Sequence, residues 1–68
     1  MVDFISLELG HRYIFTLDNG EHYEGDVVDV YDIATGIESM RFIPIAKIDW
    51  GDRFIAINGL RTKEVVEV

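Results

Sequence analysis

The segment from Leu17 to Gly25, LDNGEHYEG, constrains the fold more than any other part of the chain. Asn19-Gly20 supplies the positive backbone angles that a tight two-residue hairpin turn requires. Gly25, five residues after the turn glycine, marks a point where the second strand bends sharply or another backbone approaches closely. Because a long strand that bends at a glycine closes a small barrel, this segment predicts an antiparallel β architecture.

Chain length and cysteine content limit how such a fold can be stabilised. The chain has 68 residues and no cysteine. A chain of this length buries only ~60% of its unfolded surface, and small scaffolds usually gain stability from disulfides, metals or oligomerisation. Without cysteine, disulfides and thiolate metal sites are excluded. His11 and His22 fall on different predicted elements and are not expected to pair across the hairpin, so self-association remains as the source of stability.

The composition indicates a folded protein. Hydrophobic residues make up 49% of the chain, which has one proline, and this excludes a disordered protein. No apolar run approaches the ~18 residues of a membrane-spanning helix, and no signal-peptide pattern opens the chain. We therefore expect one domain over residues 1–68, soluble and cytoplasmic. Since no acyl- or phosphoryl-transfer motif is present, we expect neither an enzyme nor a cofactor.

The net charge of −7 is unevenly distributed. Residues 1–40 carry nine acids and a single base, Arg12, whereas residues 41–68 carry five bases and four acids. Nucleic-acid binders usually carry a basic stripe, which only the second half of this chain could supply. Asp26, Asp29 and Asp32 are three residues apart, a spacing that alternates faces along a strand. We therefore expect these acids to form a solvated face rather than a cation site.

The hydrophobic pattern predicts five short strands, preceded by a short helix. The helix is expected over Val2–Leu9 and ends at Gly10, although a short strand is the rival interpretation. Alternation predicts a strand over Tyr13–Leu17, and the strand after the turn is expected to bulge or kink past Val27.

The later elements follow from turn and breaker residues. The predicted elements are a turn over Asp32–Gly36, a strand over Ile37–Ile43 ended by Pro44, a turn over Trp50–Asp52, a strand over Arg53–Ile57, a tight turn at Asn58-Gly59 and a strand over Leu60–Val68. Residues 44–52 fit either a strand or a loop. Trp50 and Phe54 are expected to fold inward and plug one end of the barrel.

Two segments resemble the motifs of Sm and Sm-like (LSm) proteins. Residues 10–27, GHRYIFTLDNGEHYEGDV, resemble the first motif: a glycine, alternating apolar residues, Leu-x-Asn/Asp-Gly, and a second glycine five residues on. Residues 57–61, INGLR, are similar to the second motif, an aliphatic residue, a basic residue and then glycine. The resemblance implies an all-β, five-stranded Sm-like small barrel with a short N-terminal helix.

The resemblance also implies a homo-oligomeric ring of about five to eight subunits. In such rings the fourth strand of one subunit pairs with the fifth strand of the next, and single-stranded RNA threads the pore. The residues independently favour association, because the core is expected to be small and the valine-rich last strand is expected to be an edge, which invites strand addition. Lys63, Glu64 and Glu67 support the opposite interpretation, as edge residues that keep a monomer soluble.

Carried over by motif, the RNA-binding residues are Tyr31, Asp32, Asn58, Gly59 and Arg61. Tyr31-Asp32 matches the aromatic-Asp element, displaced by about one residue, but the Asn that follows it in the family is missing. Asn58 occupies the position of the basic residue before Gly59, so the stacking cation there is lost, although Arg61 is close in sequence. A base could still stack on Tyr31 and form hydrogen bonds with Asn58.

Two functions follow as hypotheses. In the first, the chain is a ring-forming, RNA-binding Sm-like protein of altered or weakened specificity. In the second, it is an acidic homo-oligomeric interaction module that does not bind nucleic acid and instead meets a basic protein partner. A monomeric barrel is the third architecture to be distinguished, and subunit mass in solution separates it from both.

Overall fold

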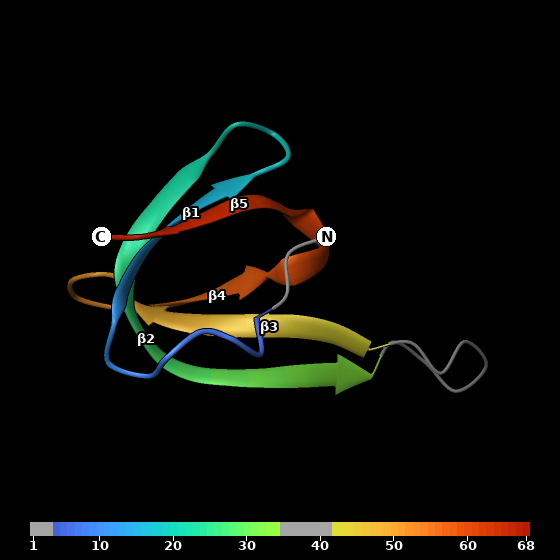
Figure 1. The fold of residues 1–68 in the computed structure, drawn as a ribbon, viewed down its shortest axis with the longest axis horizontal. Coiled ribbons are helices and arrows are strands. Elements are labelled where there is room, and N and C mark those ends of the chain that lie inside the picture. The colour runs from blue at the N-terminus through green and yellow to red at the C-terminus, as the bar shows by residue number, and fades with distance from the viewer. Residues whose placement is uncertain (1–3, 35–41) are drawn as a thin grey trace.

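The computed structural model describes residues 4–34 and 42–68. Its five strands form one antiparallel sheet in the order β4-β3-β2-β1-β5 (Figure 1). The strands are β1 (Arg12–Leu17), β2 (His22–Ala34), β3 (Phe42–Asp49), β4 (Phe54–Asn58) and β5 (Thr62–Glu67), with a 3-10 helix η1 (Gly59–Arg61) before β5. The predicted all-β class is confirmed. The barrel, however, is not closed, because β4 and β5 are the two edges of the sheet.

Strand β2 bends the sheet. In Figure 1 it curves from the wall formed by β1 and β5 to the wall formed by β3 and β4. A Cβ atom on Gly25 would overlap the carbonyl oxygen of Asp49, so only glycine permits this approach of two backbones. The register shifts by one residue between Val27 and Asp29, which is a β-bulge. The predicted bend at Gly25 and the slip past Val27 are both confirmed.

The β1–β2 hairpin is present, with a longer connection than predicted. Thr16 pairs with His22, and the Leu17 N–H donates to the Glu21 carbonyl at 2.8 Å. The Gly20 N–H donates to the Leu17 carbonyl at 3.0 Å, and Gly20 has a φ of 89°. Residues 18–21 therefore join the two strands, with Gly20 in the left-handed conformation within the turn.

The core lies between the two walls of the bent sheet. It contains seven buried residues: Phe4, Tyr13, Phe15, Val27, Ala46, Ile48 and Ile57. Phe4 meets Phe15 edge-on, with ring centroids 5.8 Å apart. This aromatic pair anchors the N-terminal segment in a core that is otherwise built from the strands.

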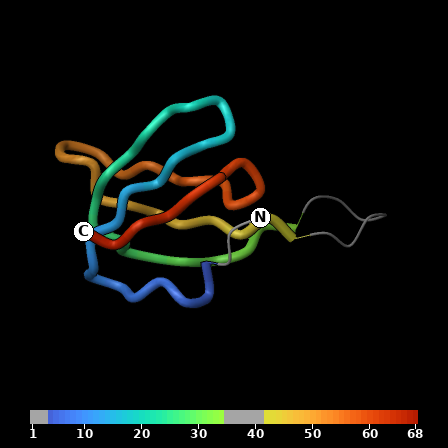
Figure 2. The backbone as a smooth tube through the Cα atoms, turned by 45° about the horizontal axis from the view of Figure 1, so that its top comes forward, coloured from blue at the N-terminus to red at the C-terminus, as the bar shows by residue number. Residues whose placement is uncertain are grey.

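The predicted N-terminal helix is wrong for the part of it that the structure describes, from Phe4 onward. Residues 4–10 form two successive turns, closed by hydrogen bonds from Leu7 to Phe4 and from His11 to Glu8. The segment runs alongside β2 (Figure 2), where the Val27 N–H donates to the His11 carbonyl at 2.9 Å. Tertiary contacts with the core and with β2 override the weak helical pattern.

Two predicted boundaries around the β2–β3 connection are also wrong. Strand β2 continues through Asp32 to Ala34, where a turn was expected, and residues 35–41 lie outside the described part of the chain. Pro44 lies within β3, opposite Asp32. Pairing of β4 with β3 reaches only to Ile45, so β4 requires no N–H group from Pro44.

Residues 44–52, which fitted either a strand or a loop, divide at Asp49. Strand β3 runs to Asp49, and the predicted turn follows, closed by a hydrogen bond from the Trp50 N–H to the Arg53 carbonyl at 2.8 Å. Within the described ranges, no helix is long and apolar enough to cross a membrane.

Candidate functional site

Two of the five predicted site residues lie in one row across the sheet. Tyr31 on β2 is paired with Ile45 on β3, and Ile45 is paired with Asn58 at the end of β4. Paired residues place their side chains on the same face, and neighbouring strands are about 4.8 Å apart. The Cα atoms of Tyr31 and Asn58 are therefore about 10 Å apart. We call the row Tyr31–Ile45–Asn58 the outer row.

The outer row lies on the face of the sheet that points away from the core. Ala46 and Ile48, which alternate with Ile45 along β3, are both core residues, and Ile45 is not in that cluster. Tyr31 remains 38% exposed, whereas Ile45 is buried. The tyrosine ring is thus exposed to solvent next to the apolar side chain of Ile45, an arrangement that suits stacking with a planar group.

Asp32 and Gly59 do not join the outer row. Asp32 follows Tyr31 directly, so strand alternation points its side chain to the opposite face. Gly59 is buried, and a Cβ atom there would lie 2.6 Å from Cγ of Pro44 and 3.2 Å from Cε2 of Phe4. The role of Gly59 is to let η1 pack closely on Pro44.

Asn58 has a structural role beside any binding role. Its Oδ1 accepts from the Leu60 N–H at 2.9 Å and so caps η1, while its main-chain carbonyl accepts from the Thr62 hydroxyl at 2.8 Å. These bonds hold the β4–β5 connection in one conformation. Nδ2 of Asn58 has no partner in residues 4–34 and 42–68, and this group is the donor that the side chain can offer to a ligand.

Arg61 contacts the β1–β2 hairpin. Its Nε lies 3.7 Å from Oδ1 of Asp18, and both side chains are more than half exposed. The Asp18 N–H also donates to the Arg61 carbonyl at 2.7 Å. The cation predicted for the site is therefore paired with a carboxylate that a main-chain hydrogen bond anchors beside it.

An open recess of about 450 Å³ lies elsewhere on the molecule, and sequence reasoning missed it. The residues that line it are Arg12, Glu24, Asp26, Asp49, Trp50 and Gly51. Arg12 contacts Glu24 at 2.7 Å and Asp26 at 3.5 Å, and the hydrogen bond that Arg12 donates to the Glu24 carboxylate raises the pKa of Arg12. Asp26 is directly paired with Asp49, a like-charge pair that no local pattern reveals because it depends on cross-strand register.

The two aromatic residues near this recess do not plug the barrel as predicted. Trp50 is 44% exposed and packs edge-on against Tyr23, with centroids 5.8 Å apart. Phe54 is 59% exposed at the start of the edge strand β4, where the Lys47 ammonium lies 4.8 Å from the ring centroid. The prediction fails because Phe54 pairs with Asp49, on the face opposite to the core.

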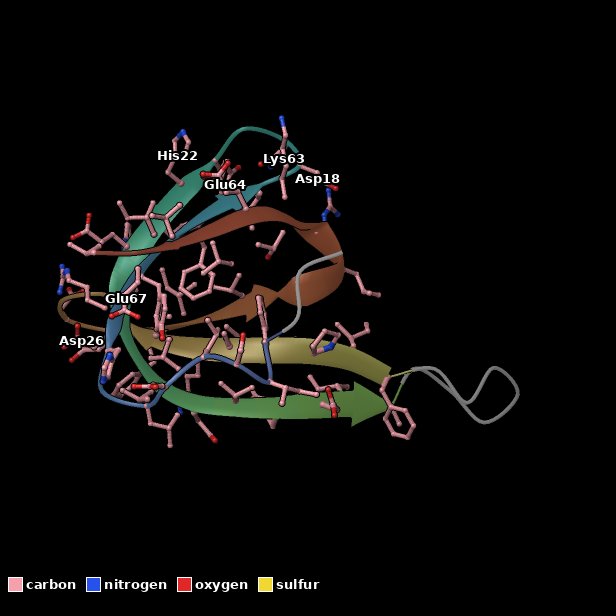
Figure 3. All side chains as sticks on the ribbon, viewed as in Figure 1. Asp18, His22, Asp26, Lys63, Glu64 and Glu67 are labelled. Atoms are coloured by element: carbon pink, nitrogen blue, oxygen red, sulfur yellow. The ribbon has the colours of Figure 1, made fainter. Side chains whose placement is uncertain are left out.

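The histidines occupy separate positions. His11 lies between Glu8, at 3.0 Å, and Glu67, at 3.4 Å, whereas His22 contacts the Thr16 hydroxyl at 3.0 Å. Figure 3 shows His22 near the hairpin and Glu67 toward the opposite end of β5. The prediction that the histidines do not pair is confirmed. In the ranges 4–34 and 42–68, no group of three or more His, Cys, Asp or Glu residues is arranged to hold a metal ion.

Comparison with known proteins identifies no relative: no family model, no curated protein and no solved structure matches the chain. The geometry of the described residues is therefore the basis for assigning a function. Its two main features are the outer row, with an exposed ring and an amide on one face, and the open sheet with its two free edges.

Proposed function

We propose that the chain is an Sm-like subunit that assembles with copies of itself into a ring of about five to eight subunits. The observation that carries this proposal is the strand order, which makes β4 and β5 the two ends of a single open sheet. Edge strands present unpaired N–H and C=O groups that add readily to another strand. Pairing of β4 from one copy with β5 from the next uses two different surfaces, and a head-to-tail contact of that kind closes into a ring.

The side chains on the two edges support the same assembly. Phe54 on β4 is 59% exposed, and Val66 on β5 is 47% exposed. Both lie on the outer face, because Phe54 is paired with Asp49, while Val66 is paired with Ile14 and alternates with Val65, which packs on the core. Joining the two edges would continue one outer face across the contact and remove both apolar side chains from water.

Light scattering on single-edge variants tests the assembly. The wild-type chain is expected at about five to eight times the subunit mass, and Phe54→Lys and Val66→Lys are each expected at one subunit mass, because a lysine on an edge blocks strand addition. A mixture of the two variants keeps one intact edge of each kind, so it is expected to form two-subunit species only. Val28→Lys, at an exposed valine away from both edges, is the control and retains the wild-type mass. A wild-type chain at one subunit mass contradicts the proposal.

For the assembled protein we propose weak binding of single-stranded RNA at the outer row. Tyr31 offers an exposed ring for base stacking, and Nδ2 of Asn58 offers a donor for a base edge. Lys47, in the adjacent row of β3, is a nearby cation, but Asp29 is paired with it across the sheet. With few cations to neutralise phosphates, we expect modest affinity that depends on stacking more than on charge.

Filter binding with uridine-rich and adenosine-rich RNA at low salt tests this part of the proposal. Tyr31→Phe keeps the stacking ring and is expected to bind like the wild type. Tyr31→Leu keeps an apolar side chain without the ring and is expected to weaken binding about tenfold, since stacking of one base contributes about 1–3 kcal/mol. Absence of wild-type binding at tens of micromolar, or equal binding by both variants, contradicts it.

The Asp26–Asp49 pair supports a second candidate function, in which the assembled chain meets a basic protein rather than RNA. Asp26 and Asp49 are paired across β2 and β3, and Asp49 has no side-chain partner within the described part of the chain. A defined lysine- and arginine-rich peptide, titrated beside the RNA, separates the two functions. Salt-sensitive binding of the peptide without binding of RNA favours the acidic module.

A further inference from the structure

Arg61 lies in the β4–β5 connection, outside the outer row, and its surroundings determine how well it can bind phosphate. It is the last residue of η1, three residues after Asn58. The capping bond from Asn58 to Leu60 and the Thr62–Asn58 bond order the main chain around it. The side chain of Arg61 is 62% exposed, so it is accessible to an incoming phosphate.

The same guanidinium is already paired with Asp18, and this partner is held in place by the main chain. Nε of Arg61 lies 3.7 Å from the Asp18 carboxylate, and the Asp18 N–H donates to the Arg61 carbonyl at 2.7 Å. Next to this bond, Leu17 at the end of β1 is paired with Thr62 at the start of β5. The β1–β2 hairpin and η1 are thus joined by two successive main-chain contacts, and the carboxylate stays close to Arg61 even when the two side chains separate.

We propose that the Asp18 carboxylate competes with phosphate for the Arg61 guanidinium, an inference that rests on the proposed RNA-binding function. A phosphate that approaches the Nε side of Arg61 competes with the Asp18 carboxylate, and at any of the guanidinium nitrogens it is repelled by that charge. An exposed ion pair is weak enough to be displaced. A polyanion that offers charge alone gains little binding free energy at such a site. An RNA that also stacks on Tyr31 gains enough binding free energy to bind. Asp18 therefore lowers the affinity of every phosphate ligand at Arg61, so that a ligand needs base contacts as well to bind.

The informative variant is Asp18→Asn, which removes the charge and retains the Asp18 N–H that bonds to Arg61. The matched control is Glu64→Gln, which removes one charge from β5 close to the hairpin, where Glu64 is paired with Thr16 (Figure 3). Both substitutions change the net charge by one unit, but Glu64 has no ion pair within residues 4–34 and 42–68. Far-ultraviolet circular dichroism verifies that both variants remain folded.

The experiment measures affinity for a uridine-rich RNA of about ten nucleotides and for inorganic polyphosphate, at low salt. Asp18→Asn is expected to raise RNA affinity about two- to five-fold and to raise polyphosphate affinity by at least as much, the range that a surface ion pair allows. Glu64→Gln is expected to change the affinity for RNA or for polyphosphate by less than half of the factor found for Asp18→Asn. In an Arg61→Gln background, Asp18→Asn is expected to have no more effect than Glu64→Gln has.

Three results would overturn the inference, and they are distinguishable. If Asp18→Asn and Glu64→Gln raise affinity equally, the effect is bulk charge and Asp18 is no specific competitor. If Asp18→Asn retains its full effect without Arg61, the competition does not act through that guanidinium. If none of the chains binds RNA at tens of micromolar, the proposed RNA-binding function fails, and the role of Asp18 fails with it.

Discussion

A Cβ atom on Gly25 would overlap the main-chain carbonyl oxygen of Asp49, so β2 and β3 are in contact at the point where the sheet bends. The neighbouring residue, Asp26, is paired with Asp49 in the ladder between the two strands. Movement of either backbone would disturb the ladder and the wall of the core beyond it. This contact makes the bend in β2 dependent on one residue type.

We predict that Gly25→Ala lowers the free energy of unfolding by about 2–3 kcal/mol, because the added methyl group forces the two backbones apart. The control is Gly51→Ala, where the added Cβ meets open space but φ is 83°. That variant carries the cost of a left-handed residue alone, about 1 kcal/mol. Urea denaturation at one protein concentration compares them, and an equal loss for both variants contradicts the steric role of Gly25.

The N-terminal segment is predicted to contribute to stability mainly through Phe4, beside which Leu7 is only partly buried against the core. Phe4 is 1% exposed and packs on Phe15, whereas the next residue, Ile5, is 89% exposed. We expect Phe4→Ala to cost about 3–4 kcal/mol and Ile5→Ala to change stability by less than about 0.5 kcal/mol. The midpoints of thermal unfolding measure both. A small loss for Phe4→Ala would mean that the segment does not complete the core.

Asn58 allows its capping role to be separated from its proposed binding role. Asn58→Ala removes the acceptor for the Leu60 N–H and is expected to cost about 1 kcal/mol. Asn58→Asp keeps an acceptor oxygen and is expected to retain stability while it adds a charge that weakens RNA binding. Urea denaturation and filter binding on the same samples test this separation, which an unstable Asn58→Asp variant would refute.

Tyr23 is predicted to ionise at higher pH than an ordinary tyrosine. Its hydroxyl donates to the Glu21 carboxylate, and this hydrogen bond raises the pKa of Tyr23. Because the folded-state pKa lies above the unfolded value, the contribution to stability is full below the unfolded pKa of about 10 and is lost as pH rises through the folded pKa.

An NMR titration of the tyrosine ring carbons measures this pKa. In Glu21→Gln the hydrogen bond loses its charge, so the pKa of Tyr23 is expected to fall toward its ordinary value. Asp52→Asn, at an exposed carboxylate of the β3–β4 turn, is the control and leaves the pKa of Tyr23 unchanged. A shift of equal size in both variants would indicate a general effect of net charge.

Local chemistry was enough to predict several elements from the sequence. Gly25 marked the bend in β2, and the phase slip past Val27 marked the bulge, because both are written into the order of residues along one strand. Trp50-Gly51-Asp52 marked the turn between β3 and β4 in the same way. The pairing of Tyr31 and Asn58 with Ile45 was not predictable, since it depends on the register between three strands.

The sequence by itself therefore determined the class of fold and the places where the chain turns, since glycine and strand alternation act over a few residues. Only the tertiary structure decided what the N-terminal residues do, because burial of Phe4 against Phe15 outweighs a weak helical preference. It also decided that Pro44 lies inside β3 and that Arg61 meets Asp18. These outcomes depend on which distant strands become neighbours, and that is a property of the packed sheet rather than of any one segment.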